Sequence, residues 1–120
     1  MKRFKDLLFT EMDHKPTAFN ATLQLGHLDI SDGYGEGLYG SGPSYDTYEV
    51  SVWDRNTEKI VPLSASDDVI GWQSKSEVDS LMVNIQKEPG FAEACRIFKR
   101  TQYNKCFDNI SHMRDEAFSS

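Results

Sequence analysis

The sequence predicts an α+β fold: a small antiparallel sheet of three to four strands, packed by a short N-terminal helix and two to three C-terminal helices. Along residues 17–30 and 47–54, apolar and polar residues alternate, which is the period of strands with one buried face. From residue 74 onward, apolar residues recur every three or four positions, as on amphipathic helices. A length of 120 residues is typical of one domain, so we expect residues 1–120 to form a single domain.

The first predicted element is a short helix over residues 2–12. Phe4, Leu7 and Leu8 would lie on one face of this helix. The helix is expected to end before Pro16, because the residue that precedes a proline avoids the α region.

Residues 17–30 predict one long strand, with alternating apolar positions from Phe19 to Leu25. The alternation changes phase at Gly26, which we interpret as a β-bulge. Residues 31–46 follow as a loop, because five of the eight glycines of the chain lie there.

A hairpin is predicted next, from a strand at residues 47–54, a turn, and a returning strand at residues 58–63. Along the first of these strands Tyr48, Val50 and Val52 share one face, so that Trp53 points to the other. Residues 69–72 predict a short edge strand.

The helical part begins with a capping box formed by Ser74 and Glu77, in which each side chain bonds to the backbone N–H of the other residue. This helix is expected to end at Pro89–Gly90. Two further helices are predicted over residues 91–101 and 103–117.

Negative charge is concentrated in one part of the chain. The formal net charge is −6, and residues 29–79 contain 11 acidic and three basic residues, a net charge of −8. Such asymmetry indicates a surface for a basic partner. It argues against direct binding to nucleic acid or to an anionic membrane, because both would repel the chain.

The predicted contact surface combines tyrosines and acids of the 31–46 loop with two tryptophans and an acidic pair outside it. Tyrosines on a glycine- and serine-rich background are typical of binding loops, and acids steer association with a basic partner. A tryptophan beside carboxylates is a common anchor for an arginine of a partner. The predicted partner-binding residues are Asp32, Tyr34, Glu36, Tyr39, Tyr45, Asp46, Trp53, Asp67, Asp68 and Trp72.

No cofactor, metal site or catalytic residue is predicted. Gly35, Gly37 and Gly40 match the G-x-G-x-x-G spacing of dinucleotide-binding loops, but a strand rather than a helix follows, and Glu36 would repel phosphate. The acids near this loop do not have the spacing of an EF-hand, and the histidines and cysteines do not have the spacing of a zinc site.

Cys95 and Cys106 are interpreted as buried, reduced thiols of a cytoplasmic protein, because the N-terminus lacks the apolar stretch of an export signal. A Cys–His pair for nucleophilic chemistry would require one of these thiols to meet a histidine in space.

The GYGEGLYGSG loop, the YEVSVWD strand and the DDVIGW segment before a capped helix resemble small phage- or mobile-element-encoded anti-defence proteins, such as anti-CRISPR proteins. The resemblance implies a stoichiometric inhibitor that occupies a basic nucleic-acid channel of a host complex, and it implies no residue roles. The function expected is therefore a non-enzymatic acidic inhibitor. The alternatives are an immunity protein or antitoxin that neutralises a cognate toxin, a small enzyme with a carboxylate in the glycine-rich loop, and an assembly protein that dimerises through Trp53.

Overall fold

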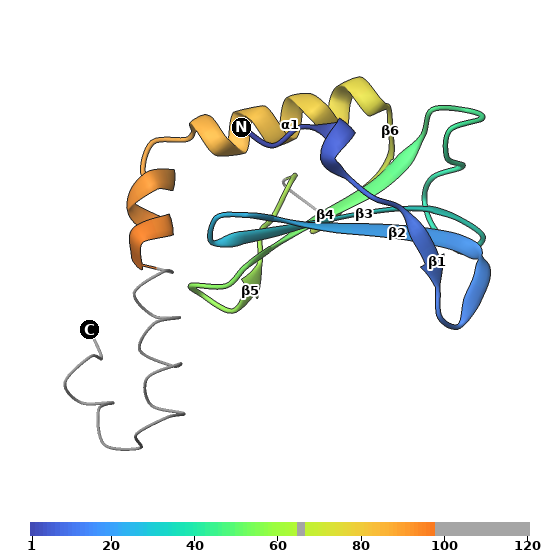
Figure 1. Ribbon diagram of the computed structural model, residues 1–120, viewed down its shortest axis with the longest axis horizontal. Coiled ribbons are helices and arrows are strands. Elements are labelled where there is room, and N and C mark those ends of the chain that lie inside the picture. The colour runs from blue at the N-terminus through green and yellow to red at the C-terminus, as the bar shows by residue number, and fades with distance from the viewer. Residues whose placement is uncertain (65–66, 98–120) are drawn as a thin grey trace, which may run out of the picture.

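A computed structural model describes residues 1–64 and 67–97. These residues form one antiparallel six-stranded sheet and a helical layer (Figure 1). In chain order the elements are the 3-10 helix η1 (Phe4–Asp6), β1 (Thr10–Met12), β2 (Lys15–Leu25), β3 (Leu28–Gly35), β4 (Tyr48–Asp54), β5 (Lys59–Ile60), β6 (Val69–Gln73) and the helix α1 (Lys75–Lys87). Residues 91–97 are also helical.

Strands β1 to β4 follow one another across the sheet in sequence order. The last strand in that series, β4, carries two short partners on its other edge: β5 pairs with its end, and β6 with its beginning. All of these pairings are antiparallel, so consecutive strands need only short connections.

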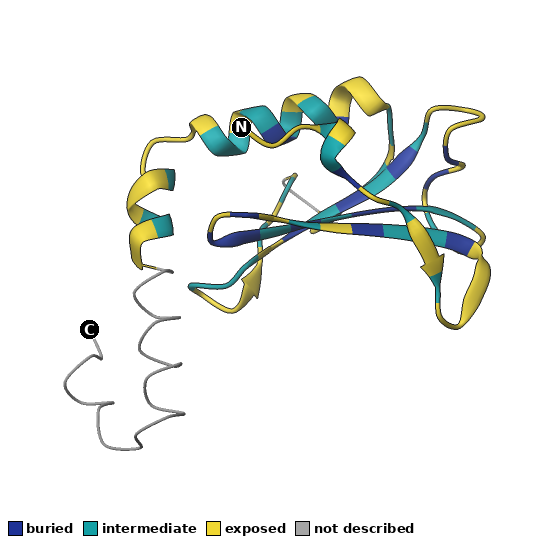
Figure 2. Ribbon diagram, in the orientation of Figure 1, coloured by how far each residue is buried: buried dark blue, intermediate teal, exposed yellow. Residues whose placement is uncertain are grey.

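The core lies between one face of the sheet and a layer made by α1 and the N-terminal segment (Figures 1 and 2). Alternate residues of the three long strands point into it, and α1 contributes Val78 and Met82, both fully buried. The sheet side of this core includes Leu25, Ile30, Val50 and Val52. The opposite face of the same strands has no such layer over it among residues 1–64 and 67–97, and it carries mostly polar side chains.

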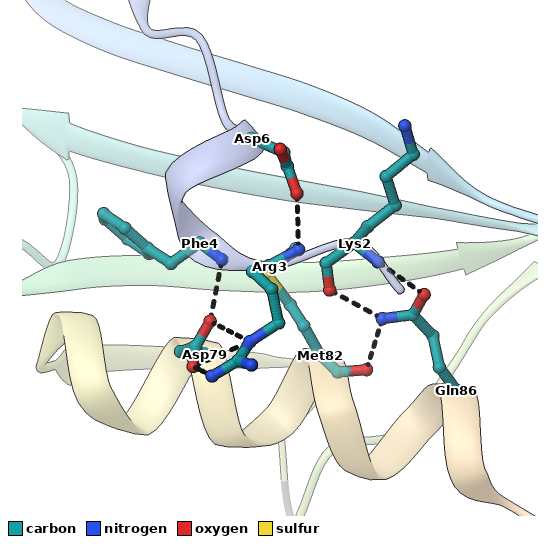
Figure 3. Close-up of polar contacts among 7 residues, drawn as sticks. All are labelled: Lys2, Arg3, Phe4, Asp6, Asp79, Met82 and Gln86. Carbon is teal, nitrogen blue, oxygen red and sulfur yellow. Dashed lines mark hydrogen bonds and ion pairs between the residues drawn. The ribbon is translucent and has the colours of Figure 1, made fainter.

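The N-terminal segment is fastened to α1 by polar contacts (Figure 3). The Asp79 carboxylate accepts hydrogen bonds from the Phe4 backbone N–H at 2.8 Å and from Arg3 Nε at 3.0 Å, and it forms an ion pair with the Arg3 guanidinium. Two turns further along, the Gln86 amide exchanges two hydrogen bonds with the Lys2 backbone. These contacts hold Phe4 against the sheet, where its ring lies 5.1 Å from that of Tyr48.

The predicted N-terminal helix over residues 2–12 is wrong. Only Phe4–Asp6 forms a single 3-10 turn, and Thr10–Met12 is a strand that pairs with β2. The reason is tertiary packing, because Phe4, Leu7 and Phe9 reach the sheet from an extended backbone and leave Leu8 exposed. With β1 added, the sheet has six strands rather than the three to four expected.

The long strand predicted over residues 17–30 is two strands. The chain reverses at Gly26–His27, where Leu25 pairs directly with Leu28. Gly26 has a φ of +61°, the positive φ that type II′ hairpins place at the first of their two central residues. The change of phase at Gly26 thus marks a hairpin rather than a bulge. The start of the predicted loop, up to Gly35, continues β3.

The predictions for the second half of the chain agree better with the structure. Strands at residues 47–54 and 69–72 are confirmed as β4 and β6, whereas the strand expected over 58–63 is limited to Lys59–Ile60. The capping box is confirmed, with both of its hydrogen bonds present at 2.9 and 3.0 Å. The helix predicted for residues 103–117 lies outside the described residues. None of the helices in the described ranges is long and apolar enough to span a membrane.

Candidate functional site

Two exposed aromatic side chains meet at one corner of the sheet. Tyr39 comes from the loop between β3 and β4, and Trp72 from the end of β6; their ring centroids lie 6.5 Å apart in an edge-to-face arrangement. Tyr39 is 61% exposed and Trp72 57% exposed, although aromatic rings are usually buried. The Trp72 backbone N–H donates to the Tyr39 carbonyl at 2.7 Å, which fixes the two segments to each other.

The backbone at Trp72 is strained. Its φ is +57°, a left-handed conformation that is rare for a large side chain. The neighbouring Gly71 is required by the same contact, because a Cβ there would collide with the Tyr39 side chain. Strained, exposed aromatic residues are characteristic of functional surfaces, where packing holds a conformation that the residue alone would not adopt.

A carboxylate is bonded to the backbone of one of these two residues. Glu49 belongs to β4 and stands opposite the irregular Gly71–Trp72 step, where the pairing between β4 and β6 shifts register. Burial raises the pKa of Glu49, and a hydrogen bond from the Tyr39 backbone opposes that shift. Within the described part of the chain, no cationic side chain forms an ion pair with Glu49. We call Tyr39, Glu49 and Trp72 the aromatic–carboxylate site.

The loop that carries Tyr39 is folded on itself rather than extended. The Gly35 N–H donates to the Gly40 carbonyl at 2.9 Å, and the Gly42 N–H donates to the Thr47 carbonyl at 2.8 Å. The G-x-G-x-x-G sequence therefore builds a compact turn that ends β3. The same turn positions Tyr39 next to β6.

Asp32 is not on a surface loop. It lies within β3 on the core face, opposite Ala21 and Val50, and it is 0% exposed. Neither of its carboxylate oxygens accepts a hydrogen bond from the described residues. Burial raises the pKa of Asp32 to about 7, because the charged form is poorly solvated there. In this conformation its side chain is out of reach of a partner.

Tyr34 also belongs to the interior rather than to a recognition loop. Its ring lies 5.0 Å from Phe19, 5.2 Å from Phe9 and 5.8 Å from Tyr48, and it is only partly exposed. Its role here is to extend the aromatic part of the core.

The other predicted residues are exposed but scattered. Asp46 accepts a hydrogen bond from the Lys75 N–H at 2.8 Å, at the start of α1, and Glu36 accepts one from Thr17 Oγ1 at 2.7 Å. Asp67 and Asp68 precede β6 and are separated from Trp72 by most of that strand. Tyr45 is exposed in the loop between β3 and β4, and Trp53 is exposed in β4. The structure thus brings together Tyr39 and Trp72 alone, of the ten predicted residues.

Many of the acids that carry the excess negative charge form contacts within the fold. Of the acids in residues 29–79, at least seven accept hydrogen bonds from other residues, and Asp32 is buried. The seven are Asp29, Glu36, Asp46, Glu49, Asp54, Glu77 and Asp79. The charge of −8 is therefore not one continuous patch.

Sequence reasoning missed Glu49, although a signal for it was present. In the strand around Tyr48, Val50 and Val52, Glu49 has the opposite parity, which places it on the open face of the sheet. Within the described ranges, no group of three His, Cys, Asp or Glu side chains is arranged to hold a metal ion.

Comparisons of the chain with protein-family models, with curated proteins and with solved structures found no match.

Proposed function

We propose that this protein is a non-enzymatic binding domain that docks onto a basic surface of a larger protein or nucleoprotein complex. The aromatic–carboxylate site is the centre of that contact. The observation that carries the proposal is that Glu49, a half-buried carboxylate with a raised pKa, accepts a hydrogen bond from the Tyr39 backbone and has no ion-pair partner among the described residues, while the exposed Tyr39 and Trp72 rings meet 6.5 Å apart.

The chemistry of the site fits an arginine of the partner. A guanidinium group is planar, stacks on aromatic rings and donates two parallel hydrogen bonds to a carboxylate. Tyr39 and Trp72 supply the rings, and Glu49 supplies the carboxylate. Because the site is partly desolvated before binding, an incoming cation would stabilise the charged form of Glu49 and lower its pKa.

The charge of the whole chain favours the approach of a basic partner. Glu36, Asp67 and Asp68 are exposed, and the chain as a whole carries a net charge of −6. Such charge raises the association rate more than it stabilises the complex, and it does so less at high salt.

Inhibition follows if the surface that is covered is the one with which the partner binds nucleic acid. A phage-type inhibitor of a host nucleoprotein complex would act in this way. An immunity protein bound to a basic toxin is the alternative, and it would use the same site.

Affinity capture tests the proposal. The tagged protein is incubated with bacterial lysate, with and without nuclease treatment, and eluted in rising salt. We expect a basic protein to be retained, to elute with salt and to be enriched after nuclease treatment. Trp72→Gly and Glu49→Gln should reduce its recovery by about tenfold or more, as expected for the centre of an interface.

Trp53→Ala is the matched control, since Trp53 is an exposed tryptophan outside the aromatic–carboxylate site. Recovery equal to that of the unmodified protein is expected for this variant. Retention of the same partner by Trp72→Gly, or its loss in Trp53→Ala alone, would contradict the proposed site.

A further inference from the structure

A cysteine and a histidine meet at the end of the sheet that lies opposite the aromatic–carboxylate site along β3. Cys95 Sγ lies 3.6 Å from His27 Nδ1. His27 is in the β2–β3 turn, and Cys95 is in the helical residues 91–97, so 68 positions of sequence separate them. We propose that Cys95 is a reactive thiol, activated by His27, that forms mixed disulfides with small disulfide molecules.

The surroundings of His27 position it for this role. The side chain is only 7% exposed, and its ring packs at 5.3 Å from that of Phe91. Its backbone carbonyl accepts a hydrogen bond from the Arg55 N–H at 2.9 Å, which ties the turn to the end of β4. A buried imidazole needs a polar partner, and the Cys95 thiol is the one that faces Nδ1.

The helical segment with Cys95 is docked on this turn. Asn56 Nδ2 donates to the Ala94 carbonyl at 2.8 Å, one residue before the cysteine. Gly26 allows the close approach, because a Cβ at this position would collide with Cys95 Sγ. The thiol is therefore held against the hairpin, and it is partly exposed.

A hollow of about 480 Å³ is lined by His27 and by Ala94, the residue before Cys95. His27, Asp54, Phe91 and Ala94 contribute to its wall, together with apolar residues such as Leu81 and Ile85. The charged groups near the pair are Asp54 and Glu88, which line the hollow, and Arg96, which pairs with Glu93 on the helical segment.

The chemistry is thiol–disulfide exchange. With the ring proton of His27 on Nε2, Nδ1 accepts the thiol proton, and Cys95 becomes a thiolate. The thiolate attacks one sulfur of the disulfide, a new Sγ–S bond forms and the original S–S bond breaks. The departing thiolate takes the proton from the imidazolium and leaves as a thiol. Cys95 is oxidised and the departing sulfur is reduced, so no other oxidant is required.

The test uses the full chain with Cys106→Ser, so that Cys95 is the remaining thiol of the two in the sequence. The probe is bis(2-hydroxyethyl) disulfide, which is small and uncharged, and intact mass reports the adduct. We expect Cys95 to react at pH 7 about tenfold or more faster than free cysteine, because His27 Nδ1, 3.6 Å from Sγ, accepts the thiol proton.

His27→Gln in the same background should slow the reaction at pH 7 by about tenfold or more, because no imidazole then accepts the thiol proton. His14→Gln, which changes an exposed histidine elsewhere, should have no effect. A Cys106→Ser protein that reacts no faster than free cysteine would overturn the proposal, and this measurement stands even if His27→Gln does not fold. Equal rates with and without His27 would overturn it as well.

Discussion

Asp32 shows how one residue can oppose the pattern around it. Its cross-strand neighbours, Ala21 and Val50, are apolar, and a position buried among such residues usually holds an apolar side chain. An ionised carboxylate there lacks both water and a hydrogen-bond partner among the described residues. The group responds by holding its proton up to a pH of about 7, where its pKa lies.

This raised pKa predicts that the protein loses stability as the pH rises. The folded state binds the Asp32 proton more tightly than the unfolded state, in which the pKa is the ordinary 3.8. The contribution of the neutral group is complete below pH 4 and is lost as the pH rises towards 7 and beyond. At 1.36 kcal/mol for each pKa unit, the full loss is on the order of 4 kcal/mol.

Asp32→Asn removes the titration and should make the free energy of unfolding nearly independent of pH in this range. Urea unfolding at pH 5 and pH 8 measures the difference. Asp68→Asn is the control, because Asp68 is exposed. An equal decrease in stability between the two pH values for Asp32→Asn and the unmodified protein would show that another group causes it.

Trp72 is the opposite case to Asp32, because it is a largely apolar side chain that is exposed. Its backbone is also strained. A non-glycine residue in the left-handed region costs about 1–2 kcal/mol, and glycine does not. Trp72→Gly should therefore unfold with a free energy about 1 kcal/mol higher than Trp72→Ala, although both remove the ring. Equal stabilities of the two variants in urea would mean that the backbone at this position is relaxed.

At the scale of elements, helices and strands with a local sequence signal were predictable, and tight turns were less so. The capping box of α1 is confirmed, because its two hydrogen bonds are local and depend only on Ser74 and Glu77. The alternation of apolar and polar residues in β4 is also local, and it predicted that strand. At Gly26 a change of phase fits a bulge and a hairpin equally, and only pairing of the two halves distinguishes them. The extended segment that leads into β1 had no local sequence signal. Its residues Phe4, Leu7 and Phe9 are stabilised by packing against the sheet, not by their neighbours in the sequence.

The contact between α1 and the N-terminal segment predicts a second effect of pH, at the acidic end. Hydrogen bonds from Arg3 and from the Phe4 backbone lower the pKa of Asp79 to about 2. The stabilisation by these contacts is present above pH 4 and is lost as the pH falls towards 2. Asp79→Asn should remove it at all pH values.

Because Arg3 is exposed and Asp79 partly so, solvent screens the pair, and we expect only a small loss of unfolding free energy. Hydrogen exchange of the Phe4 amide should accelerate in Asp79→Asn, while Glu88→Gln, an exposed acid after α1, leaves it unchanged. Slow exchange at Phe4 in Asp79→Asn would mean that the apolar contacts alone hold the segment.

For the whole molecule, composition indicated a basic partner but not the place where it binds. At least eight of the eleven acids in residues 29–79 are buried or bonded to other residues. Tyr39 and Trp72 were each predicted from sequence. Their contact was not, because it depends on the folded loop after β3 and on the irregular pairing of β6 with β4.

The central claim is that the aromatic–carboxylate site binds a guanidinium group. The protein has two tryptophans, so Trp53→Phe leaves Trp72 as the single fluorescent tryptophan. The measurement is a titration of this variant with an arginine-rich peptide, and with a lysine-rich peptide of the same length and charge, at low and high salt. Trp72→Phe, which keeps Trp53, reports any change away from the site.

We predict that Trp72 fluorescence changes with saturation, that the arginine peptide binds more tightly than the lysine peptide, and that Glu49→Gln weakens binding by about tenfold or more. The signal from Trp53 should stay constant. Equal affinity for the two peptides with no effect of Glu49→Gln, or no change at Trp72, would contradict the claim.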